Sequence, residues 1–137
     1  MKKSFITAIV SVCLIFSMSV PAVAFASEGG GIYQPQWANV SDILLAMDYN
    51  GGAVNWTGEI SGYSRVTSIS ATFTLARQNS SGQYEYVDSW NASSTKTYLY
   101  KAASKTTARG TYRLSVSATV KGSSGTETVT DSLVKTL

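Results

Sequence analysis

The segment from Gly110 to Lys121 is the sequence feature that most restricts what this chain folds into. Apolar side chains alternate with polar ones over five full periods, and the apolar positions are Tyr112, Leu114, Val116, Ala118 and Val120. A period of two is typical of a β-strand with one face in a core and the other in water. An apolar strand face must be covered by a second layer, so the pattern predicts a packed sheet.

The N-terminal residues have the layout of a secretory signal peptide. Two lysines precede an apolar run from Phe5 to Val20, and Ala24 and Ala26 are the small residues before a cleavage site. The alternative, a membrane anchor, is disfavoured because serines and a proline interrupt the run, which is short for the roughly 20 residues of a spanning helix. We expect a signal peptide over residues 1–26 and a secreted, extracellular chain that begins at Ser27, with no membrane attachment after cleavage.

The composition excludes several kinds of chemistry. The sequence has no histidine, and its one cysteine, Cys13, lies in the apolar run. The mature chain is therefore expected to have no disulfide, no thiol nucleophile, no Cys/His zinc site and no histidine-based triad. We predict no enzyme activity, no catalytic residue, no cofactor and no metal. The segment from Asp48 to Gly52 resembles a calcium-binding loop only superficially, because Ala53 occupies the position where that loop needs glycine.

Nucleic acid is not an expected partner. Loss of the two N-terminal lysines with the signal peptide leaves nine basic and eight acidic side chains. A nearly neutral chain without a basic patch lacks the charge that binds a phosphate backbone.

After a glycine-rich lead over residues 27–38, we expect a single domain over residues 39–137. Val40 to Tyr49 fits a strand or a helix face, and the strand is favoured because Asn50-Gly51-Gly52 makes a tight turn into the next run. The other predicted strands are 54–60, 69–75, 84–90, 97–101, the strand from Gly110 to Lys121, and 126–133. Predicted turns lie at 79–82, 91–95 and 122–125, with a connection at 102–109. Seven short strands indicate an all-β sandwich.

Several side chains are expected to form the core. They are Trp56, Phe73, Tyr112, Leu114 and Val116, with Trp56 and Tyr112 on facing or neighbouring strands. Gly58 falls on the inward parity of its strand. There it is expected to leave room for the Trp56 ring or to mark a bulge.

Trp56 on the second strand, and the run Gly110-x-Tyr112-x-Leu114-x-Val116-x-Ala118 before a glycine-rich hairpin, resemble a fibronectin type III domain. The resemblance implies a seven-stranded immunoglobulin-like β-sandwich in which Tyr112 forms a corner through its hydroxyl. The cysteine pair of true immunoglobulin domains is missing. The whole layout is also similar to small secreted proteins of Gram-positive bacteria. Neither resemblance implies an activity, because domains of this fold have many unrelated functions.

Aromatic side chains are the candidate binding residues. Tyr84, Tyr86 and Trp90 share one parity of a predicted strand, together with Asp88, and Tyr98 and Tyr100 share one parity of the next. If these strands pair and the rings face outward, they form a flat platform that stacks on sugar rings or on partner side chains. In the alternative interpretation, the same rings fill the core as cross-strand pairs. The predicted ligand-binding residues are Tyr84, Tyr86, Trp90, Tyr98 and Tyr100.

These features favour a secreted, non-enzymatic binding module that acts at the cell envelope or in the medium. The expected partner is an unknown protein or a cell-wall glycan. The alternative function is a structural subunit that joins other copies by edge-strand pairing.

Overall fold

The computed structural model describes residues 37–137. The expected signal peptide and most of the expected lead lie outside the described residues. Within residues 37–137 the chain forms seven strands and no helix. No helix in this part of the chain is long and apolar enough to cross a membrane. The strands are β1 (Val40–Asn50), β2 (Ala53–Gly62), β3 (Val66–Gln78), β4 (Tyr84–Ser94), β5 (Tyr98–Thr106), β6 (Thr111–Gly122) and β7 (Gly125–Thr136).

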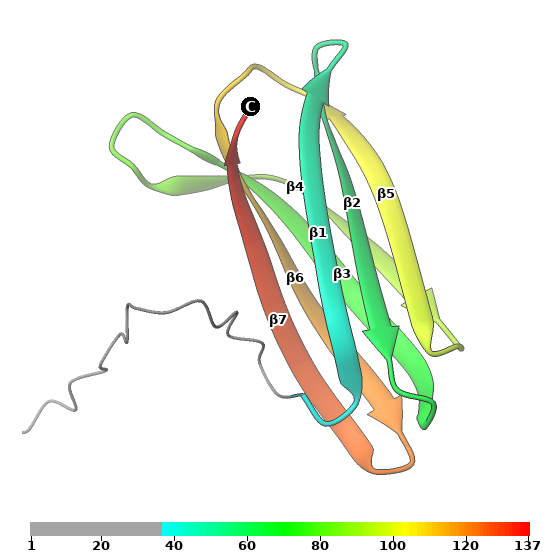
Figure 1. Ribbon diagram of the computed structural model, residues 1–137. Coiled ribbons are helices and arrows are strands. Elements are labelled where there is room, and N and C mark those ends of the chain that lie inside the picture. Colours follow the sequence, from blue (N-terminus) through cyan, green and yellow to red (C-terminus); the bar gives the residue numbers. More distant parts are fainter. Residues whose placement is uncertain (1–36) are drawn as a thin grey trace, which may run out of the picture. The chain divides into compact units, whose positions relative to one another are not determined.

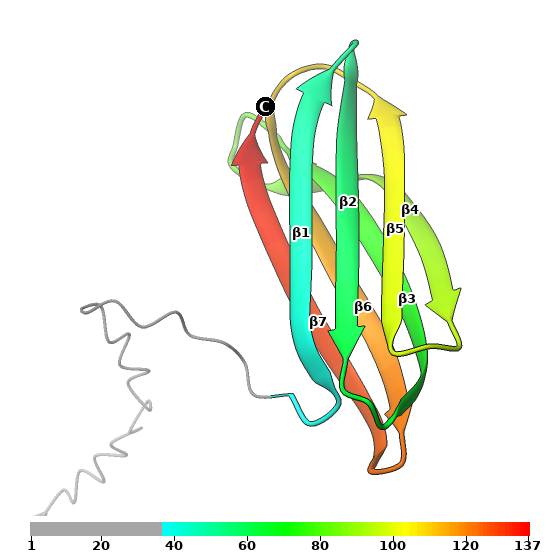
Figure 2. The ribbon, with the colours of Figure 1, turned by 45° about the vertical axis from the view of Figure 1, so that its right-hand side comes forward.

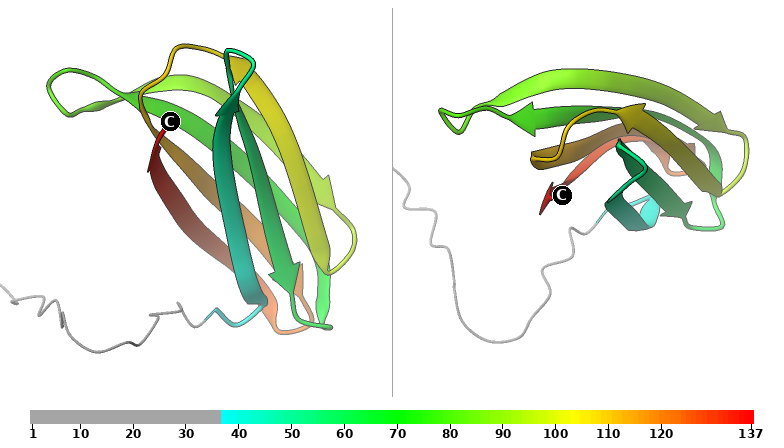
Figure 3. Two further views of the ribbon diagram at one scale, coloured as in Figure 1. Left: turned by 45° about the horizontal axis from the view of Figure 1, so that its top comes forward. Right: turned by 90° about the horizontal axis from the view of Figure 1, so that it is seen from above.

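The strands form two antiparallel sheets that pack face to face as a sandwich. One sheet has the order β1-β2-β5 and the other the order β4-β3-β6-β7. The three-stranded sheet lies in front of the four-stranded sheet (Figures 1 and 2). Seen from above, the two sheets are separate layers, and the four-stranded sheet is visibly twisted (Figure 3). The expected all-β sandwich of seven strands is confirmed.

The strand that organises the sequence is β6, at the centre of the larger sheet, and its inward face is fully buried. Its buried side chains are Tyr112, Leu114, Val116, Ala118 and Val120. From the opposite sheet, Val54, Trp56 and Ile60 are equally buried. The Trp56 ring lies 5.0 Å from the ring of Phe73 and 5.0 Å from that of Trp90, centroid to centroid. The predicted core is confirmed, with Trp56 and Tyr112 on facing sheets.

Tyr112 also stabilises the connection through which the chain passes from one sheet to the other. Its hydroxyl donates to the main-chain carbonyl of Ala108 (2.5 Å) and lies 3.0 Å from the hydroxyl of Thr107. Both residues belong to the short connection between β5 and β6. The corner that the resemblance implies is therefore present.

The ambiguous first segment is a strand, as favoured, and its turn explains why. Asn50 pairs with Ala53, so Gly51 and Gly52 alone form the loop. Their φ angles are +61° and +77°, which is the left-handed conformation that a two-residue hairpin requires. The two glycines therefore fix the register of β1 against β2.

Gly58 has a different role from the expected one. The β2 register runs through it without a bulge on either side. A Cβ atom at Gly58 would lie 2.9 Å from Cζ of Phe73 and would overlap Cε1 of the same ring. The missing side chain thus makes room for Phe73 of the facing sheet, and not for Trp56.

Two predicted boundaries near the middle of the chain are wrong. The turn expected at 91–95 begins later, because β4 continues to Ser94 and Asn91 accepts a hydrogen bond from the Thr72 hydroxyl of β3 (2.8 Å). The expected connection at 102–109 is also shorter, because β5 continues to Thr106 along β2. In both cases pairing with a neighbouring strand overrides the local turn signals.

Candidate functional site

The structure divides the predicted aromatic set among three environments. Because β4 and β5 belong to different sheets, they do not form the expected pair. Tyr98 and Tyr100 lie on the outer face of the three-stranded sheet, whereas Tyr84 and Tyr86 lie on the outer face of the other sheet. Trp90 points inward and packs against the core. The expectation of a single platform is wrong, and the five rings cannot contact one ligand.

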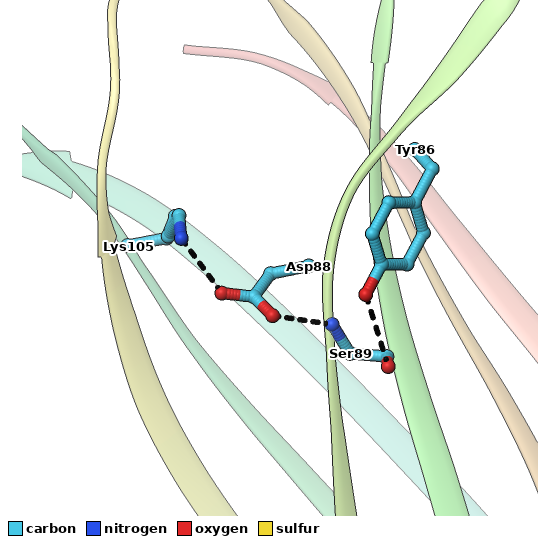
Figure 4. Close-up of polar contacts among 4 residues, drawn as sticks. All are labelled: Tyr86, Asp88, Ser89 and Lys105. Atoms are coloured by element: carbon cyan, nitrogen blue, oxygen red, sulfur yellow. Dashed lines mark hydrogen bonds and ion pairs between the residues drawn. The ribbon is translucent and has the colours of Figure 1, made fainter.

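A β-bulge separates Tyr86 from Trp90. Leu75 of β3 pairs with Asp88, and the next residue, Ala76, pairs with Tyr86, so that Val87 is an extra residue in β4. An extra residue reverses the facing of everything beyond it. Tyr86 is consequently 67% exposed. Its hydroxyl donates to the hydroxyl of Ser89 (3.2 Å), as Figure 4 shows.

Tyr84 lies on the same outer face as Tyr86 and is half-buried. The guanidinium of Arg113 in β6 stacks on its ring, 4.3 Å from the centroid. This cation–π contact already covers part of the ring. Tyr84 is therefore less open to a ligand than Tyr86.

Asp88 links the two sheets on the side of the sandwich where β4 and β5 lie next to each other. Lys105 Nζ donates to its Oδ2 (2.8 Å), and the main-chain N–H of Ser89 donates to its Oδ1 (2.8 Å) (Figure 4). The hydrogen bond from Lys105 and that from Ser89 hold the pKa of Asp88 below its ordinary value of 3.8.

This ion pair gives a pH prediction. A lowered pKa contributes stability above the ordinary value, and that contribution is lost as pH falls through the lowered pKa. Lys105→Gln should therefore raise the pKa of Asp88 toward 3.8, and NMR titration of the Asp88 carboxyl carbon measures this change. The small difference in stability between the variant and the wild type should vanish in acid. An Asp88 pKa that is the same in both proteins would contradict this.

The outer face of the three-stranded sheet carries the strongest candidate site, which we call the tyrosine face. Tyr98 and Tyr100 are 46% and 52% exposed, and Leu44 on β1 is 57% exposed. The register places Leu44, Glu59 and Tyr100 side by side across β1, β2 and β5, with Tyr98 one step further along β5. The tyrosine face is defined by these four residues and the hollow beside them.

The hollow results from small side chains in the next row. Ala46, Thr57 and Ala102 lie side by side across the three strands. Together with Asn55 and Ser104 beyond them, they line an open depression of about 450 Å³. Low side chains next to protruding rings give a shallow, open surface that can hold a flat ligand.

The outer face of the three-stranded sheet, which contains the tyrosine face, is acidic. Among the outward positions of β1, β2 and β5, Asp42, Asp48 and Glu59 carry charge, and all three are negative. Partial burial and the nearby Glu59 carboxylate raise the pKa of the Tyr98 hydroxyl above its ordinary value of 10.0. Within residues 37–137, no three acidic side chains gather closely enough to hold a metal ion. The face thus offers aromatic rings and hydrogen-bond acceptors.

Sequence reasoning missed Leu44 and Glu59. Both were visible as outward positions, since Leu44 is out of phase with Ile43, and Glu59 lies between the inward Gly58 and Ile60. Their proximity to Tyr100 depends on the order of the strands, which alternation does not reveal. The sequence matches no protein-family model and no curated protein, so the function must be inferred from the surface itself.

Proposed function

We propose that this chain is a secreted, non-enzymatic binding module that holds a neutral glycan of the cell envelope on its tyrosine face. The observation that carries the proposal is the exposure of Tyr98 and Tyr100 next to Leu44 on one face of one sheet. Exposed aromatic rings that lie together mark interaction sites on soluble proteins. The apolar faces of sugar rings stack on such side chains, and the hydroxyl groups of the sugar need hydrogen-bond acceptors nearby.

The charge of the face supports a neutral ligand. Asp42, Asp48 and Glu59 repel phosphate and carboxylate groups, which disfavours nucleic acids and acidic polymers. The same carboxylates accept hydrogen bonds from sugar hydroxyls, and such charge-assisted bonds are the stronger kind. The hollow over Ala46, Thr57 and Ala102 leaves room for the edge of a ring beside Tyr100.

The topology supports a fibronectin type III-like domain. In constant-type immunoglobulin domains the fourth strand joins the sheet of the first, second and fifth strands. Here β4 pairs with β3 in the other sheet. The Tyr112 corner and the absence of a cysteine pair are consistent with the same assignment. Such domains are common in extracellular proteins, which agrees with the expected signal peptide.

The edges of the sheets argue against assembly by strand pairing. On β7, Glu127, Asp131 and Lys135 occupy inward positions, and on β5 so does Lys105. β4 carries the bulge at Val87. Inward charges and bulges are the features by which sheet proteins prevent edge pairing. Lys135 also donates to the main-chain carbonyl of Met47 on β1 (2.8 Å).

The test is a double substitution on the tyrosine face. Tyr98→Ala with Tyr100→Ala should reduce the affinity for soluble, neutral β-1,4-linked N-acetylglucosamine oligomers by about 10- to 100-fold, since exposed aromatic anchors contribute most of the affinity of such surfaces. The matched control is Tyr86→Ala, which removes an even more exposed ring from the opposite face. Because all three rings are exposed, thermal melts should show a folded domain. Equal binding by the folded double variant and the wild type would refute the proposal.

A further inference from the structure

The outer face of the four-stranded sheet carries an array of hydroxyl groups. In three successive rows across β4, β3, β6 and β7, eleven of the twelve outward positions are Ser or Thr and the twelfth is Asn. The rows are Ser89–Thr74–Ser115–Ser132, Asn91–Thr72–Ser117–Thr130 and Ser93–Ser70–Thr119–Thr128. We call this array the hydroxyl lattice. It lies on the side of the sandwich opposite the tyrosine face.

Two properties distinguish the hydroxyl lattice from an ordinary solvated surface. None of its twelve positions carries a charge, whereas about a quarter to a third of a typical protein surface does. The side chains are also mostly free of one another. Within the lattice, the one hydrogen bond between side chains joins Thr72 to Asn91. Ser89 also accepts a hydrogen bond from Tyr86 outside the lattice, but most of the face presents donors and acceptors that the protein itself does not use.

We propose that the hydroxyl lattice is a second binding site, for an extended, neutral polysaccharide chain. Hydroxyl groups both donate and accept, so they match a partner whose own polar groups are hydroxyls. Strand spacing sets the groups about 4.8 Å apart across the sheet and about 6.7 Å apart along each strand. A polymer with repeating hydroxyl groups makes many weak contacts with this array, and their contributions to the binding free energy add up along the polymer.

Other occupants fit less well. The lattice covers about 400 Å² by the same spacings, which is half of the roughly 800 Å² that each partner contributes to a stable protein complex. Serine is depleted in protein interfaces, and Ser and Thr are under-represented among hot spots. The lack of charge disfavours nucleic acids and acidic polymers. The twist of the sheet in Figure 3 disfavours a rigid planar lattice such as ice.

The site is independent of the proposed function, because no residue is shared between the two faces. The probe is amorphous cellulose, a neutral polymer whose polar groups are hydroxyls and whose chains can follow a twisted surface. The protein should sediment with it, and binding should be the same at low and high NaCl, because the lattice contributes no charge that salt could screen.

Two lattice variants test the assignment. Ser117→Lys places a charged, bulky side chain at the centre of the array, and Thr72→Ala with Thr130→Ala removes two hydroxyls of the middle row without adding charge. Each should reduce the affinity for cellulose about tenfold, the effect of losing one or two hydrogen bonds. The matched control is Ser123→Lys in the hairpin between β6 and β7, outside the lattice, which should bind like the wild type.

The same assay separates this site from the tyrosine face. Tyr98→Ala with Tyr100→Ala should bind cellulose like the wild type, and adding Ser117→Lys should reduce the affinity about tenfold, as it does in the wild type. Wild-type protein that stays in the supernatant would overturn the inference. So would folded lattice variants that bind fully, or activity in an ice-recrystallisation assay without binding to the polymer. Loss of binding in the tyrosine variant alone would also overturn it, while leaving the proposed function standing.

Discussion

Trp56→Ala is expected to lower the free energy of unfolding by about 3–5 kcal/mol, the cost of deleting a large buried aromatic side chain. Trp56 is 2% exposed, and its ring contacts both Phe73 and Trp90. These three rings join the two sheets near the middle of the sandwich. No disulfide supports the sheets, because the chain has a single cysteine. The core must therefore supply the stability of the domain, which is typically about 5–15 kcal/mol in total.

A thermal melt measures this loss, and the melting temperature should fall by about 15 °C or more. Trp56→Phe is the matched control. It keeps an aromatic ring and removes an indole N–H that has no hydrogen-bond partner among residues 37–137. Its cost should be less than half that of the alanine variant. A Trp56→Ala protein that melts like the wild type would mean that Trp56 is not inside the sandwich.

Gly58→Ala is expected to destabilise the domain by about 3 kcal/mol, although alanine is normally tolerated in a strand. The new methyl group would overlap the Phe73 ring, which is fully buried and cannot move aside. The loss of stability does not come from backbone strain, because Gly58 does not have a positive φ. The loss would therefore report a steric contact between the two sheets.

Chemical denaturation of a double-mutant cycle isolates that contact. In a Phe73→Leu background the side chain opposite Gly58 is smaller, so Gly58→Ala should cost at least about 1 kcal/mol less than in the wild type. Additive effects of the two substitutions would show that Gly58 and Phe73 do not meet, and would contradict the packing of β2 against β3.

Strand alternation predicted the buried half of this protein well. Tyr112, Leu114 and Val116 were assigned to the core from their period alone, and so were Trp56 and Phe73, all of which are buried. Burial of an apolar stripe is a local property of a strand, since each side chain must face one side or the other. The Asn-Gly-Gly turn was equally readable, because only a few residue types adopt its backbone conformation.

The candidate site was harder to predict, because its geometry depends on two non-local features. The bulge at Val87 reverses the facing of Tyr84 and Tyr86 relative to Trp90, and nothing in the residue types around it marks its place. The chain also changes sheets between β4 and β5, so Tyr98 and Tyr100 meet Leu44 and Glu59 instead of Tyr86. Which strands pair is decided by the packing of the whole sandwich. Exposed residues contribute little to that decision.

An NMR titration with soluble β-1,4-linked N-acetylglucosamine oligomers tests the tyrosine face most directly. If the face holds a neutral envelope glycan, the signals of Leu44, Glu59, Tyr98 and Tyr100 should shift progressively with ligand, and the ring protons of the two tyrosines should shift most. Ser123, in the hairpin between β6 and β7 and outside both proposed sites, should not follow them. Unchanged tyrosine-face signals at saturating oligomer, in a protein whose spectrum shows it to be folded, would contradict the proposed function.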